Sequence, residues 1–270
     1  MKMHEHFTPA LPVVVSIAGS DCSGGAGIQA DIKTCAASGV FCPTAITAVT
    51  AQNPTAVTRV EYVGDRMLAS QLESIFDSIH PDAVKIGMIP CASAACVIAE
   101  AIRKYELKNI VIDPVLEATA GGSLSGETYS TTKAVTENLF PEAFLVTPNI
   151  PELFRLLGQE EKTETEECAR LLMEKFSVRN LLVKGGHAEG GYCIDTLYSE
   201  EVKKVTYKSE RILTTHTHGT GCTLSSAIAC GLAKGNDLRT AIEEAKRFIV
   251  NAIKKGAEYP VYPDNGPLLY

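Results

Sequence analysis

Short apolar runs alternate with amphipathic stretches along most of the chain. Asp65–Ile79 is the clearest helical stretch, because its apolar residues recur on one face and Pro81 follows as a stop. The alternation predicts right-handed crossovers and a mostly parallel sheet with helices on both faces. Six apolar runs have the length and composition of buried strands; they are Pro12–Gly19, Phe41–Ala51, Ala83–Met88, Asn109–Pro114, Ala143–Thr147 and Asn180–Lys184.

The pattern changes after Lys184. Two further runs, Tyr192–Tyr198 and Val202–Tyr207, follow a Gly-Gly pair and are separated by two glutamates, which predicts an antiparallel hairpin at the sheet edge. Two helices, Gly219–Lys234 and Asp237–Lys255, should close the chain. We predict an α/β fold: a single three-layer αβα domain over residues 1–270, with residues 1–10 as a flexible tail.

Composition narrows the possible functions. The 270 residues are 45% hydrophobic and 21% charged, enough for a sizeable core. A formal charge of −7 without a basic block argues against general nucleic-acid binding. No apolar run approaches the roughly 18 residues of a membrane helix, so no membrane association is expected. The nine cysteines are odd in number and form no CxxC, which predicts buried free thiols in a reducing cytoplasm.

A first glycine-rich segment, Gly19–Gly27, joins the first strand to the helix Ile28–Ser38. Glycines at such a junction let the backbone approach a ligand, and ligands bind beyond the carboxyl ends of parallel strands. The segment formally fits a GxGxxA dinucleotide fingerprint, but Ala45–Ala51 lacks the expected ribose-binding acid. It is not a Walker A loop either, because no Gly-Lys-Ser/Thr follows. A glycine turn without a ligand stays an alternative.

A second glycine-rich segment opens the helix after Thr217. Gly219, Thr220 and Gly221 would expose unpaired amides at the positive end of the helix dipole, where a phosphate or a developing oxyanion binds. Cys222 follows in the first turn, where we expect a lowered thiol pKa and a role as base. His218 is the rival base. A buried cysteine after a glycine turn is the structural alternative.

Polar residues also end other predicted strands. Lys184 and Asp113 each close an apolar run, so both should lie at the carboxyl edge. Asn149 and Glu152 are three residues apart and share a face if helical, a pairing that suits magnesium (Mg²⁺) beside a polyphosphate. Helix capping for Asn149 and a solvated turn for Asp113 are the alternatives. Taken together, these groups predict Mg²⁺-dependent phosphoryl transfer.

From Pro12 to Ala257 the chain resembles the ribokinase superfamily, and within it the hydroxymethylpyrimidine and phosphomethylpyrimidine kinases of thiamine biosynthesis. The matching runs are Ile17–Asp21, Ser23–Asp31, Ala51–Asn53, Lys85–Met88, Thr147–Asn149 with Glu152, Lys184–His187 and His218–Thr223. The resemblance implies a cytoplasmic, homodimeric kinase. It would use ATP to phosphorylate 4-amino-5-hydroxymethyl-2-methylpyrimidine, and then the monophosphate to the diphosphate.

The resemblance also implies roles for individual residues. The pyrimidine site would be lined by Gly19, Ala26, Asp31, Thr50, Gln52 and Met88. The nucleotide would be bound by Asn149, Lys184 and His187, and Mg²⁺ by Asp113, Asn149 and Glu152, partly through water. The catalytic set would be Lys184, the anion hole from Gly219 through Thr220 and Gly221, and Cys222, which stands where many superfamily members carry an aspartate base. Assistance by a monovalent cation stays open.

Two positions depart from the family pattern. Thr119 stands where members often have a lysine, so the second phosphorylation is less supported than the first, and Thr50 stands where an aliphatic residue is common. A pyridoxal or pyridoxine kinase of the same fold is one alternative, but the amide of Gln52 suits a pyrimidine, because it offers both a donor and an acceptor. The other alternative is a non-catalytic regulatory domain that binds the pyrimidine, but such a domain would not need Lys184 or Cys222.

Overall fold

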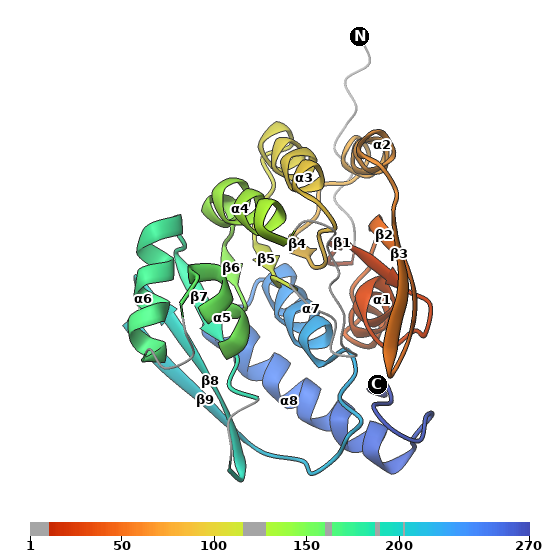
Figure 1. Ribbon diagram of the computed structural model, residues 1–270, viewed down its shortest axis with the longest axis vertical. Coiled ribbons are helices and arrows are strands. Elements are labelled where there is room, and N and C mark those ends of the chain that lie inside the picture. The colour runs from red at the N-terminus through yellow and green to blue at the C-terminus, as the bar shows by residue number, and fades with distance from the viewer. Residues whose placement is uncertain (1–10, 116–127, 160–163, 187–189, 202) are drawn as a thin grey trace.

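The computed structural model describes residues 11–115, 128–159, 164–186, 190–201 and 203–270 (Figure 1). Within them, nine strands form one sheet in the order β3-β2-β1-β4-β5-β6-β7-β8-β9. The strands are β1 (Val14–Asp21), β2 (Thr44–Asn53), β3 (Ala56–Tyr62), β4 (Ala83–Ile86), β5 (Ile110–Ile112), β6 (Leu145–Val146), β7 (Asn180–Val183), β8 (Tyr192–Ser199) and β9 (Lys203–Glu210).

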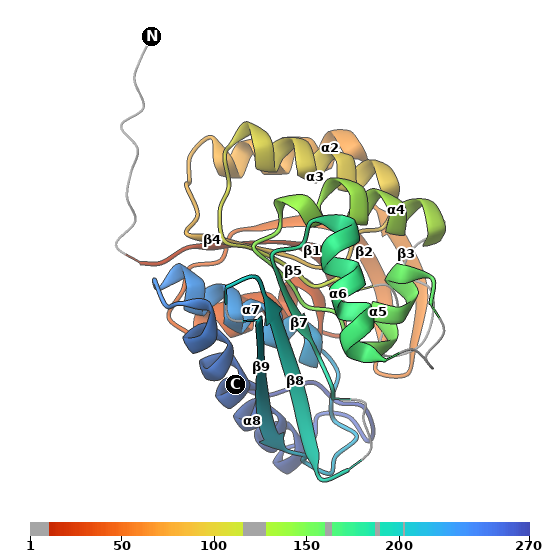
Figure 2. The ribbon, with the colours of Figure 1, turned by 90° about the vertical axis from the view of Figure 1, so that its left-hand side faces the viewer.

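Helices cover both faces of the sheet and make three layers (Figure 2). One face carries α1 (Gly27–Ala37), α7 (Thr220–Ala233) and α8 (Leu238–Glu258). The other carries α2 (Asp65–Phe76), α3 (Ala92–Lys104), α4 (Thr128–Asn138), the 3₁₀ turn η1 (Phe140–Glu142), α5 (Ile150–Leu157) and α6 (Thr165–Phe176). Each layer of helices buries its own apolar cluster against the sheet, which explains why the central strands are apolar on both sides.

Strands β2, β1, β4, β5, β6 and β7 pair in parallel, and β8 and β9 form an antiparallel hairpin at one edge. The predicted fold class is therefore confirmed, including the edge hairpin. Because the parallel strands share a direction, their carboxyl ends meet along one edge of the sheet. The polar residues that follow β1, β5, β6 and β7 are brought together there.

The other edge strand was not predicted. Strand β3 pairs antiparallel with β2 after a turn in which the Asn53 side chain accepts the backbone N–H groups of Thr55 and Ala56, both at 2.9 Å. None of the β3 residues is fully buried, and Thr58, Arg59 and Glu61 are polar. A strand without a buried face carries no apolar pattern, so it could not be predicted from hydrophobic periodicity.

All nine cysteines are free thiols, as predicted, but only Cys35, Cys168 and Cys230 are fully buried. The expectation of buried thiols is therefore wrong for the other six. Over the part of the chain that the structure describes, no helix has the length and apolar character needed to span a bilayer. The predicted tail, residues 1–10, lies outside the described residues, as do Thr119 and His187.

Candidate active site

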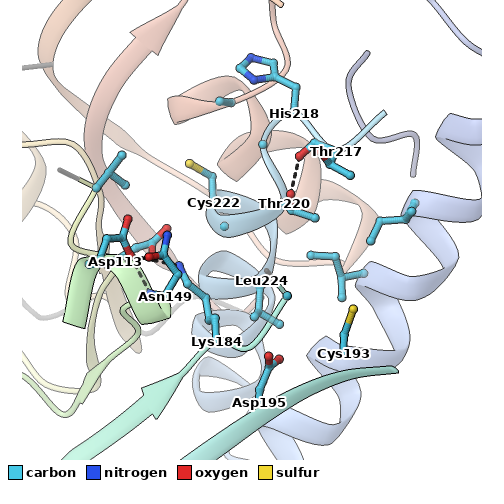
Figure 3. Close-up of a pocket in the computed structure, with 18 of the residues that line it drawn as sticks. Asp113, Asn149, Lys184, Cys193, Asp195, Thr217, His218, Thr220, Cys222 and Leu224 are labelled. Atoms are coloured by element: carbon cyan, nitrogen blue, oxygen red, sulfur yellow. Dashed lines mark hydrogen bonds and ion pairs between the residues drawn. The ribbon is translucent and has the colours of Figure 1, made fainter. Parts of the chain in front are cut away.

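A cavity of about 650 Å³ lies at the carboxyl ends of the parallel strands and is bordered by the N-terminal turns of α1, α5 and α7. It brings together most of the predicted site residues from distant parts of the chain. Those that line it are Gly19, Ala26, Thr50, Gln52, Met88, Asp113, Asn149, Glu152, Lys184, Gly219, Thr220, Gly221 and Cys222. Figure 3 shows Asp113, Asn149 and Lys184 grouped beside the first turn of α7.

The central pair of the cavity is Lys184 with Asp113. The Lys184 Nζ donates to Asp113 Oδ1 at 2.6 Å and lies 4.0 Å from Glu152 Oε2. Burial alone would raise the pKa of Asp113, but the charges of Lys184 and Lys85 outweigh it and hold that pKa below its usual range. Burial disfavours the Lys184 ammonium, yet Asp113 and Glu152 raise its pKa. Both partners are therefore charged at neutral pH.

Asn149 and Glu152 form a capping box at the start of α5. Asn149 Oδ1 accepts the Glu152 N–H at 2.8 Å, and Glu152 Oε2 accepts the Asn149 N–H at 2.7 Å. The capping alternative is thus correct for Asn149, although both side chains also border the cavity. Burial and the neighbouring Asp113 raise the pKa of Glu152 to about 7, against the opposing effect of Lys184.

The turn before α7 is compact because two of its residues are glycines. Gly219 has φ +86°, and a Cβ there would lie 1.9 Å from the carbonyl oxygen of Gly25 in the first glycine segment. A Cβ on Gly221 would lie 3.3 Å from Asp113 Oδ2 and 3.4 Å from Lys184 Nζ. The missing side chains therefore let the first glycine segment and the Lys184–Asp113 pair approach the positive end of the helix.

Cys222 lies in the first turn of α7, half-buried, at the cavity wall (Figure 3). The expectation of a lowered thiol pKa is wrong. Burial, together with the carboxylates of Asp31 and Asp113, raises the pKa of Cys222 to about 11, although the charge of Lys85 acts in the opposite direction. At neutral pH the group is a thiol, because the cost of burying a thiolate outweighs its stabilisation by Lys85.

His218 does not face the reacting groups. Its ring points away from the Asp113–Lys184 group in Figure 3, and its Nε2 lies 2.9 Å from Asp21 Oδ2. The same carboxylate accepts the backbone N–H groups of Gly25 at 3.1 Å and Ala26 at 2.8 Å. His218 and Asp21 therefore link the two glycine segments. Asp21 was missed, although an acid two residues before Ser23 in a glycine-rich run is a signal for an Asx turn.

Comparison with known proteins identifies the family. A model of the phosphomethylpyrimidine kinase family matches residues 21–268. The chain belongs to this family. A hydroxymethylpyrimidine/phosphomethylpyrimidine kinase of Rhizobium meliloti is 39% identical over 258 residues, which cover 95% of this chain and 96% of that protein.

Other members of the family are longer proteins. The thiamine biosynthesis bifunctional protein ThiED of Geobacter sulfurreducens is 41% identical over 94% of this chain, and a probable thiamine biosynthetic bifunctional enzyme of rice is 39% identical over 95%. The chain spans about half the length of these two relatives, 51% and 46%.

Two solved structures are similar to this chain. The phosphomethylpyrimidine kinase of Clostridium difficile is 37% identical, with a TM-score of 0.76 over 90% of this chain and 99% of that one. The pyridoxal kinase of Bacillus subtilis, solved as an ADP complex, is 34% identical, with a TM-score of 0.85 over 96% and 97%. The fold is therefore shared by a phosphomethylpyrimidine kinase and a pyridoxal kinase.

In this member of the phosphomethylpyrimidine kinase family, Asp31 does not line the cavity. The Asp31 side chain is fully buried beneath the cavity, and its Oδ1 and Oδ2 lie 2.9 Å and 2.8 Å from the Lys85 Nζ. The carboxylate also accepts hydrogen bonds from the hydroxyl groups of Ser16 and Ser226. The predicted contact with the pyrimidine is therefore corrected. Helix α1 turns Asp31 toward the sheet, and its two oxygens accept four hydrogen bonds, which leaves no room for a ligand.

Part of the cavity wall was not predicted. Helix α8 and the edge hairpin contribute Ile249, Ile253 and Cys193 to it. Asp195 accepts the Gly185 N–H at 3.0 Å and pairs with the Lys246 Nζ at 2.7 Å. The sequence carried no sign of this pair, because β8 and α8 meet only through tertiary packing.

Proposed function

We propose that this chain catalyses the ATP-dependent phosphorylation of 4-amino-5-hydroxymethyl-2-methylpyrimidine and of its monophosphate, as a step of thiamine biosynthesis. One observation carries the proposal: the Lys184–Asp113 pair lies against the Gly219–Cys222 turn in the same cavity as Gln52. A cation, an amide nest and a polar reader of a ring are what phosphoryl transfer to a heterocyclic alcohol requires. The family membership supports the same substrate class.

The pyrimidine would lie between the first glycine segment and the end of β2. Gln52 borders the cavity there. A Cβ on Gly19 would lie 2.7 Å from the Met88 sulfur, so the glycine leaves room for the Met88 side chain to form an apolar wall. We propose that Met88 packs on the ring face while Gln52 pairs with the ring nitrogen and amine.

The phosphate chemistry would rest on positioning and charge. We propose that Lys184 and the amides of the Gly219–Cys222 turn stabilise the transferring phosphoryl group, whose negative charge is spread over its oxygens in the transition state. The hydroxyl of the substrate loses its proton late in a loose transition state. Cys222, which is a thiol at neutral pH, would accept that proton only through its small thiolate fraction. We therefore assign it a smaller share of the rate than Lys184.

The cavity residues suit a Mg²⁺ ion held mainly through water and phosphate oxygens. Among the described residues, no three His, Cys, Asp or Glu side chains converge closely enough to chelate a metal by themselves. Magnesium in phosphate sites keeps several waters and uses one or two carboxylates. We propose that Glu152 and Asp113, with Asn149 beside them, hold the ion, which would neutralise phosphate charge. We also propose, as the resemblance and the free cysteines suggest, that the protein is a homodimer in the cytoplasm.

Pyridoxal kinase activity is the less favoured alternative. A pyridoxal kinase shares the fold at a TM-score of 0.85, but the matching family model and the R. meliloti relative are phosphomethylpyrimidine kinases. A substrate panel with ATP and Mg²⁺ separates the candidates: the pyrimidine alcohol, its monophosphate and pyridoxal are compared, with products identified by mass. We expect phosphorylation of both pyrimidines. Turnover of pyridoxal alone, or binding without turnover, would overturn the proposal.

A further inference from the structure

The last residues of the described chain fold back over α8. Leu268 is buried in the apolar cluster that α7 and α8 form, and the Leu269 N–H donates to the Ala252 carbonyl at 3.3 Å. The ring of Tyr270 stacks on that of Phe248 with the centroids 5.7 Å apart. Asn265–Tyr270 is therefore an anchored segment, which we call the strap.

The strap pairs with the loop that leads into the proposed anion hole. The His218 N–H donates to the Gly266 carbonyl at 3.3 Å, and the Gly266 N–H donates to His216 Nδ1 at 2.9 Å. His218 and Pro267 form an isolated parallel bridge. Residues 211–217 of the loop lie in no helix or strand, so these bonds add order to the short-range hydrogen bonds that the loop makes within itself.

Two other contacts connect the strap to both halves of the cavity. The Tyr270 hydroxyl lies 2.7 Å from Thr223 Oγ1, one residue after Cys222 in the first turn of α7. At the other end of the strap, the Asn265 amide donates to the Pro54 carbonyl, in the turn that follows Gln52. The strap thus touches the backbone next to the phosphate side and next to the pyrimidine side, although none of its own residues lines the cavity.

We infer that the strap is a positioning element that holds the amides of Thr217–Thr223 in the geometry needed for phosphoryl transfer, an inference that rests on the proposed function. An amide nest lowers a barrier only if its donors are fixed before the reaction, because reorganisation costs part of the stabilisation. The strap residues act through the loop and contact neither substrate. Their loss should therefore lower kcat more than it raises KM for the pyrimidine.

Two variants loosen the strap in different ways. Tyr270→Phe keeps the ring stacking and removes the hydroxyl that meets Thr223. Gly266→Ala places a Cβ 2.7 Å from His216 Nδ1, so the strap must move away from the loop. Tyr259→Phe, on an exposed tyrosine outside the strap, is the matched control. We expect each strap variant to lower kcat about five-fold or more, because losing the roughly 1 kcal/mol of one hydrogen bond corresponds to a factor of about five. Tyr259→Phe should leave kcat unchanged.

Hydrogen–deuterium exchange tests the inference without reference to any substrate. In both strap variants the amides of Thr217–Thr223 should exchange at least about five-fold faster than in the parent chain, while those of α3 keep their rate. Unchanged exchange in Thr217–Thr223 together with unchanged kcat would overturn the inference that the strap positions these amides. Faster exchange in a chain that phosphorylates none of the panel substrates would instead overturn the proposed function and leave the strap intact.

The combination Gly266→Ala with His216→Ala gives a check by a double-variant cycle. Removing the imidazole opens the space that the added Cβ needs, but it also removes the acceptor of the Gly266 N–H. Gly266→Ala should therefore accelerate exchange less in the His216→Ala background than in the parent chain. If it accelerates exchange equally in both backgrounds, the steric account of the strap is wrong.

Discussion

Two lysine–aspartate pairs lie beneath the N-terminal end of α7, and they differ mainly in access to the cavity. In one, Lys184 keeps 14% of its side chain exposed above an Asp113 that is 1% exposed. In the other, Lys85 and Asp31 are both fully buried. Each aspartate also contacts a serine of α7. The Ser225 hydroxyl lies 3.4 Å from Asp113 Oδ2, and the Ser226 hydroxyl donates to Asp31 Oδ1 at 2.7 Å.

The difference shows how the same ion pair serves two purposes. Asp31 accepts four hydrogen bonds from Lys85, Ser16 and Ser226, so the buried pair is complete and ties β1, β4, α1 and α7 together. Lys184 instead borders the cavity and has a second carboxylate, Glu152, at 4.0 Å. The Lys184 ammonium is partly exposed and can meet an incoming phosphate, whereas that of Lys85 is fully enclosed. The buried pair should matter for stability and the bordering pair for rate.

The largest effect should come from Lys85→Met. It leaves the Asp31 carboxylate buried without its counter-charge, which typically costs about 3–5 kcal/mol of unfolding free energy. Urea unfolding measures the loss, with Lys204→Met as the control, because the Lys204–Glu166 pair is exposed and such pairs contribute only about 0–1 kcal/mol. Adding Asp31→Asn to Lys85→Met should restore part of the stability. Equal losses in Lys85→Met and Lys204→Met would mean that the buried pair contributes no more to stability than an exposed pair.

Lys184→Met should act on the rate. Removing a preorganised charge from the transferring phosphoryl group should lower kcat about 100- to 1000-fold, roughly 2.7–4 kcal/mol, with little change in KM for the pyrimidine. Steady-state kinetics at saturating ATP and Mg²⁺ give both constants, and Lys204→Met again serves as the control. If Lys184→Met instead loses mainly unfolding free energy and the folded fraction turns over normally, Lys184 is structural.

The two serines offer a finer comparison on adjacent positions of one helix. Ser226→Ala removes a 2.7 Å bond to a buried carboxylate and should cost about 1.5–3 kcal/mol of unfolding free energy. Ser225→Ala should cost less, about 1 kcal/mol or below, because its bond to Asp113 is long and its hydroxyl also bonds to the Gly221 carbonyl at 3.0 Å. Urea unfolding of both variants is sufficient. The reverse order would mean that the cavity-side pair carries the stability.

The smallest effect concerns Cys222, whose pKa is shifted by charges of both pairs. Burial raises its pKa to about 11, so its reactive thiolate is scarce at pH 7 and increases with each unit of pH. Alkylation by iodoacetamide, followed peptide by peptide, should accelerate about ten-fold per pH unit from 7 to 10 without levelling off. Cys96, exposed on α3, is the internal reference for labelling. A plateau near neutral pH would restore the low-pKa thiolate that the helix position by itself suggests.

The fold class and most of the cavity could be predicted from the sequence. The apolar runs predicted six parallel strands and the edge hairpin, because strand burial leaves a local pattern. Once the strands are parallel, their carboxyl ends must meet, so Asp113, Asn149 and Lys184 converge although they are far apart in the chain. The cavity-facing place of Gly219 and Gly221 at the start of α7 could also be predicted, since close backbone approach excludes a side chain.

Only the tertiary structure decided which polar groups face the cavity and which face the protein interior. Asp31 is turned into the sheet because Lys85 and two serines meet it there, and no local pattern encodes those partners. The thiol of Cys222 keeps its proton because burial outweighs the charge of Lys85, and burial depends on every element packed around it. Local sequence fixes periodicity and direction, whereas desolvation and pairing are sums over distant residues.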